Sequence, residues 1–430
     1  MATTAPFATP LYVMLKPASS HCNLACHYCY YLRAQHHAGE GTMSAALLEE
    51  FTRQYIEAQT MPEVLFTWHG GEPLMRPLSF YQRALQLQRQ YARGRHIDNC
   101  LQTNGTLLTD EWCEFLRDNH FLVGISIDGP QEMHDTYRRN KTGRPSWHSV
   151  MRGIRLLQKH GVAWNAMATV NAVNGNHPDD FYQFFRDLGC QYLQFTPVVE
   201  RNGTEICEYS VTPDQWGRFL CGVYDQWVRE DVGRIFVQTF DATLANWAGV
   251  TPGVCSLSSL CGHAAVMEAN GDVYSCDHFV YPDYLLGNIR QQTLTTMLYG
   301  EQQRSFARKK TGGLPRQCRE CHWLFACHGE CPKNRFISDR YGEQGLNYLC
   351  EGYRQFFSHV AADMDFMKAE LDAGRAPANI MERAGNRAAM ESQRTRKESN
   401  TDTITDTITD TITDTITNTI TNTITNTNKI

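Results

Sequence analysis

The chain has 430 residues, of which 42% are hydrophobic, and its 46 acidic and 40 basic side chains give a formal net charge of -6 at pH 7. This length and composition are typical of a globular protein with one large domain and a smaller one. No stripe of basic residues interleaved with aromatic residues follows the sequence, which disfavours nucleic-acid binding. We find neither a secretory signal nor an apolar run long enough to cross a bilayer, so we expect a cytoplasmic protein without a membrane partner.

Apolar, strand-like runs alternate with amphipathic stretches from residue 11 onward. Strands are expected at 11–15, 64–68, 99–102, 122–127, 164–170 and 192–197, and helices at 45–58, 78–91, 110–119, 149–160 and 179–188. Repeated strand and helix units of this length predict an α/β fold, with a parallel sheet closed or partly closed into a barrel and its crossovers outside.

Segments that can carry chemistry follow several of these strands. Active sites of such barrels lie at the carboxyl ends of the strands. We therefore expect one site to gather a cysteine-rich loop that follows the first strand and the segments 69–73, 103–105, 126–129 and 195–200.

The cysteine-rich loop contains Cys22, Cys26 and Cys29, spaced Cys-x3-Cys-x2-Cys. Three thiolates can ligate three irons of a 4Fe-4S cluster and leave the fourth iron open, whereas a four-cysteine ferredoxin pattern fills every position. The spacing therefore indicates a reaction centre. A zinc knuckle is the alternative, but a closed zinc site needs four ligands.

Eight more cysteines lie in the C-terminal half and suffice for two fully ligated 4Fe-4S clusters. They are Cys255, Cys261, Cys276, Cys318, Cys321, Cys327, Cys331 and Cys350. The other five cysteines stand singly and are interpreted as small buried residues. A disulfide framework is disfavoured because such frameworks are typical of short secreted chains.

These motifs resemble the radical S-adenosylmethionine (SAM) enzymes, through the cysteine triplet with Tyr28 before its last cysteine and the later sequence Gly70-Gly71-Glu72-Pro73. The later cysteines resemble the SPASM extension, which carries auxiliary clusters. Within that group the chain is most similar to the anaerobic sulfatase-maturating enzymes, through segments 124–130 and 276–282. The resemblance implies a partial (β/α)6 TIM-like radical SAM barrel in 1–245 and a SPASM domain in 246–373, and the composition predicts a disordered tail in 374–430.

The resemblance also implies SAM and three 4Fe-4S clusters as cofactors. In the family, SAM binds the open iron and is cleaved to methionine and a 5'-deoxyadenosyl radical. Glycines at the Gly70-Gly71 turn would let the backbone approach SAM, and Glu72 is expected to add a compensating charge. The residues implied in SAM binding are Tyr28, Gly71, Ser126, Arg138 and Val199.

The reaction implied by the resemblance is oxidation of a cysteine or serine in a target sulfatase peptide to Cα-formylglycine, within a motif such as Cys-x-Pro-x-Arg. Asp277 would take the substrate proton as general base, although it could instead cap a turn. Tyr31 matches a position near the peptide, whereas His69 stands where these enzymes commonly have glutamine, which leaves its substrate contact open. The implied partners are a sulfatase polypeptide and an electron donor such as a flavodoxin or ferredoxin.

Two other functions remain open from the sequence. A radical SAM/SPASM enzyme could form a thioether or another cross-link in a different peptide. A non-catalytic iron-sulfur electron carrier or a zinc-binding module would leave the open iron position unexplained.

Two polar segments complete the sequence. Residues 304–310 contain a short basic cluster, which is interpreted as a solvated helix face. From residue 374 the composition turns polar, and from 401 it becomes a Thr-Asp-Thr-Ile repeat. Such a tract buries too little apolar surface to order itself, which predicts disorder.

Overall fold

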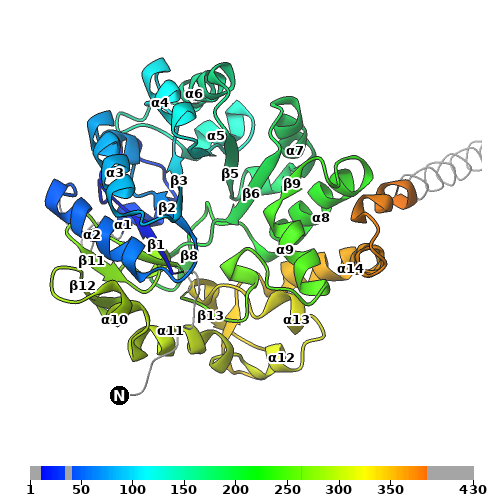
Figure 1. Ribbon diagram of the computed structural model, residues 1–430. Coiled ribbons are helices and arrows are strands. Elements are labelled where there is room, and N and C mark those ends of the chain that lie inside the picture. The colour runs from blue at the N-terminus through cyan, green and yellow to red at the C-terminus, as the bar shows by residue number, and fades with distance from the viewer. Residues whose placement is uncertain (1–10, 34–40, 263, 385–430) are drawn as a thin grey trace, which may run out of the picture.

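The computed structural model describes residues 11–33, 41–262 and 264–384 (Figure 1). The predicted disorder of the Thr-Asp-Thr-Ile repeat falls outside these residues. No helix of the described part of the chain is long and apolar enough to span a membrane.

Six consecutive parallel strands form the centre of the molecule. They are β1 (Tyr12–Leu15), β2 (Glu63–Trp68), β3 (His96–Thr103), β4 (Leu122–Ser126), β5 (Trp164–Val170) and β6 (Tyr192–Pro197), which pair in that order. The strands curve as an open arc in Figure 1, and the first and last do not pair. The predicted α/β fold with a partly closed parallel barrel is confirmed.

Helices cover the outer side of this arc (Figure 1). They are α2 (Ala45–Ala58), α3 (Leu78–Tyr91), α4 (Asp110–Asp118), α6 (Trp147–His160), α7 (Pro178–Asp187) and α8 (Pro213–Glu230). Local signals fix where they begin: the Ser44 hydroxyl accepts from the Leu47 N–H at the start of α2, and Thr212 with Gln215 forms a capping box on α8. Such side chains satisfy N–H groups that have no partner within the helix.

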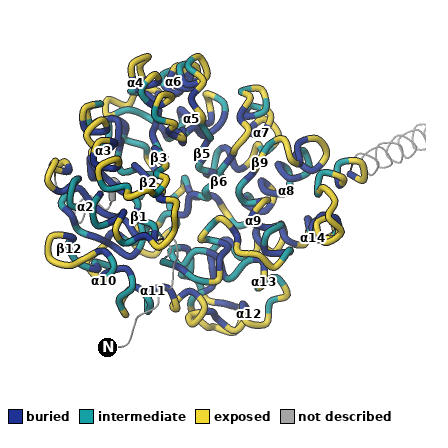
Figure 2. The backbone as a smooth tube through the Cα atoms, viewed as in Figure 1, coloured by how far each residue is buried: buried dark blue, intermediate teal, exposed yellow. Residues whose placement is uncertain are grey.

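The strands alternate between an apolar outer face and a more polar inner face. Phe66 and Trp68 of β2 are fully buried, in ring contact with Tyr55 of α2 and Tyr81 of α3. Thr67 points to the other side, where its hydroxyl accepts from the Tyr12 hydroxyl at 2.7 Å. Figure 2 shows that burial is concentrated on the strands and on the inner faces of the helices. Side chains with the parity of Tyr12 and Thr67 therefore face the barrel interior.

The sheet continues into the C-terminal half of the chain. β10 (Ala264–Met267) pairs in parallel with β1, and β11 (Asp272–Tyr274) and β12 (Leu285–Asn288) follow it in antiparallel order. At the opposite edge, β9 (Phe236–Val237) pairs with β6. The predicted domain boundary at 245/246 therefore divides the chain but not the sheet. The pairing of β10 with β1 brings residues near 268 beside the cysteine-rich loop.

Most of the remaining elements follow β6 in the chain. Two hairpins pair β7 (Arg201–Asn202) with β8 (Glu205–Ile206) and β13 (Arg335–Ser338) with β14 (Gln344–Asn347). The helices of this part are α9 (Gln238–Trp247), α10 (Leu294–Leu298), α11 (Glu301–Gly312), α12 (Arg316–Arg319), α13 (Leu324–Cys327) and α14 (Cys350–Asp372). Beyond α14 the chain still packs, because Ile380 is fully buried and Arg375 pairs with Glu370 at 2.5 Å. Ordered structure therefore extends past 373, the residue after which the sequence predicts the tail.

Candidate active site

The predicted site of the first cluster is a loop between β1 and the short helix α1 (Tyr30–Arg33). It is tied to the end of β2, because the Gly71 N–H donates to Ser19 O and the Glu72 N–H donates to His21 O, each at 2.8 Å. A Cβ atom on Gly71 would lie 2.3 Å from the His21 oxygen. Glycine is therefore required at position 71 because the cysteine-rich loop passes so close to it. The contact of Gly71 with SAM stays a prediction.

The three thiols of the loop lie close enough to affect one another's ionisation. Burial is the largest cause that raises the pKa of Cys22 to about 11 and that of Cys26 to about 12, and the nearby Cys29 contributes to both shifts. Iron binds the thiolate, so a bound cluster would supply the positive charge that favours this form.

The cysteine arrangement suits a cluster better than a single ion. Within the residues that the structure describes, no three histidine, cysteine, aspartate or glutamate side chains converge on one point as ligands of one metal ion. A 4Fe-4S cluster binds each thiolate at a different iron. A three-cysteine cluster in this loop stays the prediction that the spacing makes.

Tyr28, Asp128 and Arg138 form a buried network that interacts with Cys26. The Tyr28 hydroxyl donates to Asp128 and accepts from Arg138 at 2.9 Å, while Asp128 also accepts from the Thr169 hydroxyl at 2.9 Å. Burial opposes the charge of Arg138, but Tyr28, Cys26 and Asp128 outweigh it and raise the pKa of Arg138 above its ordinary value. Its Nε has no hydrogen-bond partner among the described residues. This N–H is available to an anionic group, as the predicted role toward SAM requires.

Two other predicted SAM contacts, Ser126 and Val199, lie at the same edge of the sheet. The Ser126 hydroxyl, at the end of β4, accepts a hydrogen bond from Gln102 Nε2 at 3.0 Å. Val199 follows β6 and is buried in the main core. The fold places both at the carboxyl ends of strands, and their contacts with SAM remain predictions.

Glu72 does not serve as a free compensating charge. It accepts hydrogen bonds from the Thr103 hydroxyl at 2.6 Å, the Asn104 N–H at 2.8 Å and the Leu74 N–H at 2.9 Å. These partners join the ends of β2 and β3. Its observed role is therefore to fix the strand ends around the loop.

Asp277 lies in a 3-10 turn directly after Cys276. Its carboxylate forms an ion pair with Lys16 and accepts from the Tyr30 hydroxyl, and the side chain is 16% exposed. These are side-chain partners rather than the backbone N–H groups that a turn cap would bind. Burial acts to raise the pKa of Asp277, but the ammonium of Lys16 outweighs this effect and holds the pKa below its ordinary value. Asp277 is thus ionised and reachable, as a proton acceptor must be.

A second buried carboxylate, Glu268, shares Lys16 with Asp277. The Lys16 Nζ lies 3.9 Å from Glu268 Oε1 and 3.4 Å from the centre of the Tyr31 ring. Glu268 also accepts from the Tyr31 hydroxyl at 2.5 Å and from the Ser19 hydroxyl at 2.9 Å. Tyr31, which the resemblance places near the peptide, therefore has its hydroxyl engaged by Glu268.

Sequence reasoning assigned no role to Lys16, Glu268 or Tyr30. The available signal was a charged residue at the end of each of two apolar runs, 11–15 and 264–267. Their meeting depends on the parallel pairing of β1 with β10, in which Leu15 lies opposite Met267.

The eight later cysteines form two sets of four. Electrostatic interactions between the thiols group Cys255, Cys261, Cys276 and Cys331 in a first set, and Cys318, Cys321, Cys327 and Cys350 in a second set. Chain order alone does not reveal this division, because Cys331 follows Cys327 yet joins the earlier cysteines. The first set lies beside Asp277, which directly follows Cys276.

The second set lines a cavity of about 170 Å³ near α12, α13 and the start of α14. Aromatic side chains of Trp323, Tyr353 and Phe357 complete its wall. A hollow surrounded by four thiols fits a fully ligated 4Fe-4S cluster.

Lys310 corrects the interpretation of the basic cluster as a solvated face. It is fully buried, and its Nζ donates to Cys255 O at 2.6 Å and Ser256 O at 2.7 Å. Arg335 donates to Lys310 O at 2.5 Å and to Gly329 O at 2.7 Å. Two cations thus brace the backbone around the first cysteine set.

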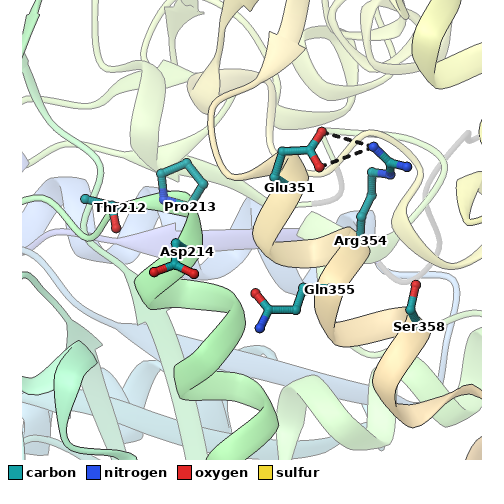
Figure 3. A pocket seen from close by; sticks show the side chains of 7 residues that line it. All are labelled: Thr212, Pro213, Asp214, Glu351, Arg354, Gln355 and Ser358. Carbon is teal, nitrogen blue, oxygen red and sulfur yellow. Dashed lines mark hydrogen bonds and ion pairs between the residues drawn. The ribbon is translucent and has the colours of Figure 1, made fainter.

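A separate, open groove of about 640 Å³ lies between the start of α8 and α14 (Figure 3). It is lined by Thr212, Pro213, Asp214, Glu351, Arg354, Gln355 and Ser358. Arg354 and Glu351 pair with each other within it at 3.1 Å. None of the predicted site residues lines this groove, so the candidate active site is the one at the strand ends.

Comparison with known proteins agrees with the site. The chain matches the Radical SAM superfamily over residues 17–186 and the SPASM iron-sulfur cluster-binding domain over 260–322. It is therefore a radical SAM enzyme with a SPASM domain, in which SAM and iron-sulfur clusters bind.

Closer relatives narrow the family. The chain is 61% identical over 398 residues to a serine-type anaerobic sulfatase-maturating enzyme of Bacteroides thetaiotaomicron, covering 88% of this chain and 96% of that protein. It is 31% identical to a cysteine-type enzyme of Clostridium perfringens, covering 82% and 96%. A solved structure of native anSMEcpe with bound AdoMet and Cp18Cys peptide superposes with a TM-score of 0.76 at 30% identity, covering 84% of this chain and 99% of that one. The chain belongs to the anaerobic sulfatase-maturating enzyme family.

Proposed function

We propose that this enzyme oxidises a serine or cysteine of a sulfatase polypeptide to Cα-formylglycine. The observation that carries the proposal is the position of Asp277, which is paired with Lys16 at the end of β1 and adjoins the first later cysteine set. The names of the relatives and the peptide bound in the superposed structure support the same substrate class.

Three 4Fe-4S clusters and SAM are the proposed cofactors. When bound, they supply the 5'-deoxyadenosyl radical and accept the electron that the substrate loses. Cys22, Cys26 and Cys29 would hold the open cluster, and the two sets of four cysteines would hold closed ones. Arg138, with its free Nε–H, would bind the SAM carboxylate.

Oxidation of a serine removes one hydrogen atom from Cβ, one proton from the hydroxyl and one further electron. Asp277 is positioned to take the proton. Its neighbours Lys16 and Tyr30 orient the carboxylate. We propose a flavodoxin or ferredoxin as the reductant of the open cluster.

Anaerobic reconstitution tests this proposal. We expect about twelve irons per chain, 5'-deoxyadenosine after reduction, and loss of two hydrogen atoms from a Ser-x-Pro-x-Arg peptide. A variant with alanine at Cys22, Cys26 and Cys29 should keep about eight irons and lose SAM cleavage. Continued cleavage in that variant would disprove the first cluster site, and a cross-linked peptide product would favour a different peptide modification.

A further inference from the structure

We propose that His69 determines substrate specificity by donating a hydrogen bond from Nε2 to the side-chain oxygen of the target serine, which favours a hydroxyl over a thiol. This inference deepens the proposed function and rests on it.

The strand register places His69 in the interior of the site. Leu15 of β1 lies opposite Trp68 of β2 and Met267 of β10, so the next residues, His69, Lys16 and Glu268, form one row across three strand ends. The His69 N–H donates to Leu15 O at 2.7 Å, which extends the pairing to His69 itself. His69 has the parity of Thr67, which faces the barrel interior. Neighbouring strands are separated by about 4.8 Å, so His69 lies next to Lys16.

The hydrogen bond to the ring fixes which nitrogen can donate. The Gly70 N–H donates to His69 Nδ1 at 2.8 Å, so the proton of the neutral ring lies on Nε2. Burial lowers the pKa of His69, which keeps the ring neutral near pH 7. Nε2 has no hydrogen-bond partner among the described residues, and the side chain is only half-buried. An unpaired N–H therefore faces the site.

Asp277 is the second polar group beside this row of residues. Both residues adjoin Lys16, Asp277 through its ion pair and His69 through the strand row. A serine hydroxyl between them could donate its proton to Asp277 and accept the Nε2–H of His69, which uses both functions of a hydroxyl group.

A thiol cannot use this arrangement equally well. Its sulfur is a weak hydrogen-bond acceptor, so a cysteine peptide would leave the His69 N–H poorly paired. A site built to pair with a hydroxyl disfavours an analogue that leaves buried polar groups unpaired.

The test compares His69→Leu and His69→Gln with the wild type on matched Ser-x-Pro-x-Arg and Cys-x-Pro-x-Arg peptides. His69→Leu should lower kcat/KM for the serine peptide by roughly 10-fold to 100-fold more than for the cysteine peptide. His69→Gln keeps a side-chain N–H donor and should retain most of the preference. His148→Leu, on the exposed face of α6, is the matched control and should behave as the wild type.

A binding measurement separates this role from a structural one. With SAM present and no reductant, the wild type should bind the serine peptide more tightly than its alanine analogue, and His69→Leu should lose that difference while keeping its iron content. An equal loss on serine and cysteine peptides would overturn the inference, because His69 would then contact a part that both peptides share. An unchanged ratio would also overturn it. Failure of the wild type to oxidise either peptide would instead overturn the proposed function.

Discussion

Two polar networks flank the cysteine-rich loop, and their charges are balanced in different ways. On the side where SAM is predicted to bind, Asp128 is surrounded by Tyr28, Thr169 and Arg138. On the substrate side, two carboxylates, Asp277 and Glu268, share the cation Lys16. The first arrangement presents an unpaired cationic N–H to a ligand, whereas the second presents an ionised acid. The contrast suits anion binding on one side and proton removal on the other.

The largest expected effect comes from removing the shared cation with Lys16→Met. Because both carboxylates would lose their counter-ion in a buried site, we expect the free energy of unfolding to fall by about 3–5 kcal/mol. Thermal and denaturant unfolding of the anaerobic holoenzyme measure this. Lys159→Met removes an exposed pair with Asp110 and should cause no measurable change.

The same variant has a predicted pH dependence. Lys16 helps to hold the pKa of Asp277 below its ordinary value, so its removal raises that pKa. An acid that must be ionised to accept a proton then loses activity at a higher pH as the solution is acidified. The acid limb of the formylglycine rate should therefore move upward in Lys16→Met. An acid limb at the wild-type pH would show that Asp277 does not limit the rate.

Asp277→Asn is expected to have the next largest effect. The amide is nearly isosteric but cannot take the proton, so formylglycine formation should fall about 100-fold. Reductive cleavage of SAM is predicted to depend on the other network, so it should be largely retained. A paired assay of 5'-deoxyadenosine and oxidised peptide distinguishes these outcomes. Equal loss of both products would mean that Asp277 supports the adjacent cluster instead.

Tyr28→Phe probes the SAM side with a smaller change. It removes the hydroxyl that donates to Asp128 and accepts from Arg138, the latter hydrogen bond having a length of 2.9 Å. One lost hydrogen bond in a charged network predicts about tenfold weaker SAM binding. Equilibrium binding without reductant measures it. Peptide oxidation at saturating SAM should be unchanged, and a loss there would show that the two networks are coupled through the loop.

The sequence predicts the two networks unequally. The end of β4 at Ser126 follows from local periodicity and the loop that holds Tyr28 follows from a short motif, and the barrel is confirmed, whereas Arg138 directly follows helix α5 (Gln131–Tyr137). The substrate side depends on Lys16 meeting Glu268, residues about 250 positions apart whose contact requires the register of β1 with β10. Periodicity identifies strands but does not specify which distant strand pairs with which.

Composition also does not predict which charged side chains are buried. Lys310 belongs to a basic run that reads as a solvated face, yet it is buried against Cys255 O. A long side chain can direct its charge to backbone oxygens inside the protein, and only the packed structure shows this. The sequence predicts that Gly71 lets the backbone approach SAM, and the structure adds that a Cβ atom there would meet the His21 oxygen.

The smallest expected effect tests whether both networks are complete without the repeat tail. A chain ending at Ala384 keeps Ile380, which is fully buried, and the hydrogen bonds that Arg375 and Asn379 donate to Glu370. It should therefore match the full chain in iron content, SAM cleavage and peptide oxidation, since the residues removed include no predicted ligand. A chain ending at Ala378 loses Ile380 and Asn379 and should unfold at a lower temperature, because a buried apolar side chain is lost from the core. Reduced peptide oxidation with normal SAM cleavage in the Ala384 chain would place the tail at the substrate side and break the independence of the two networks.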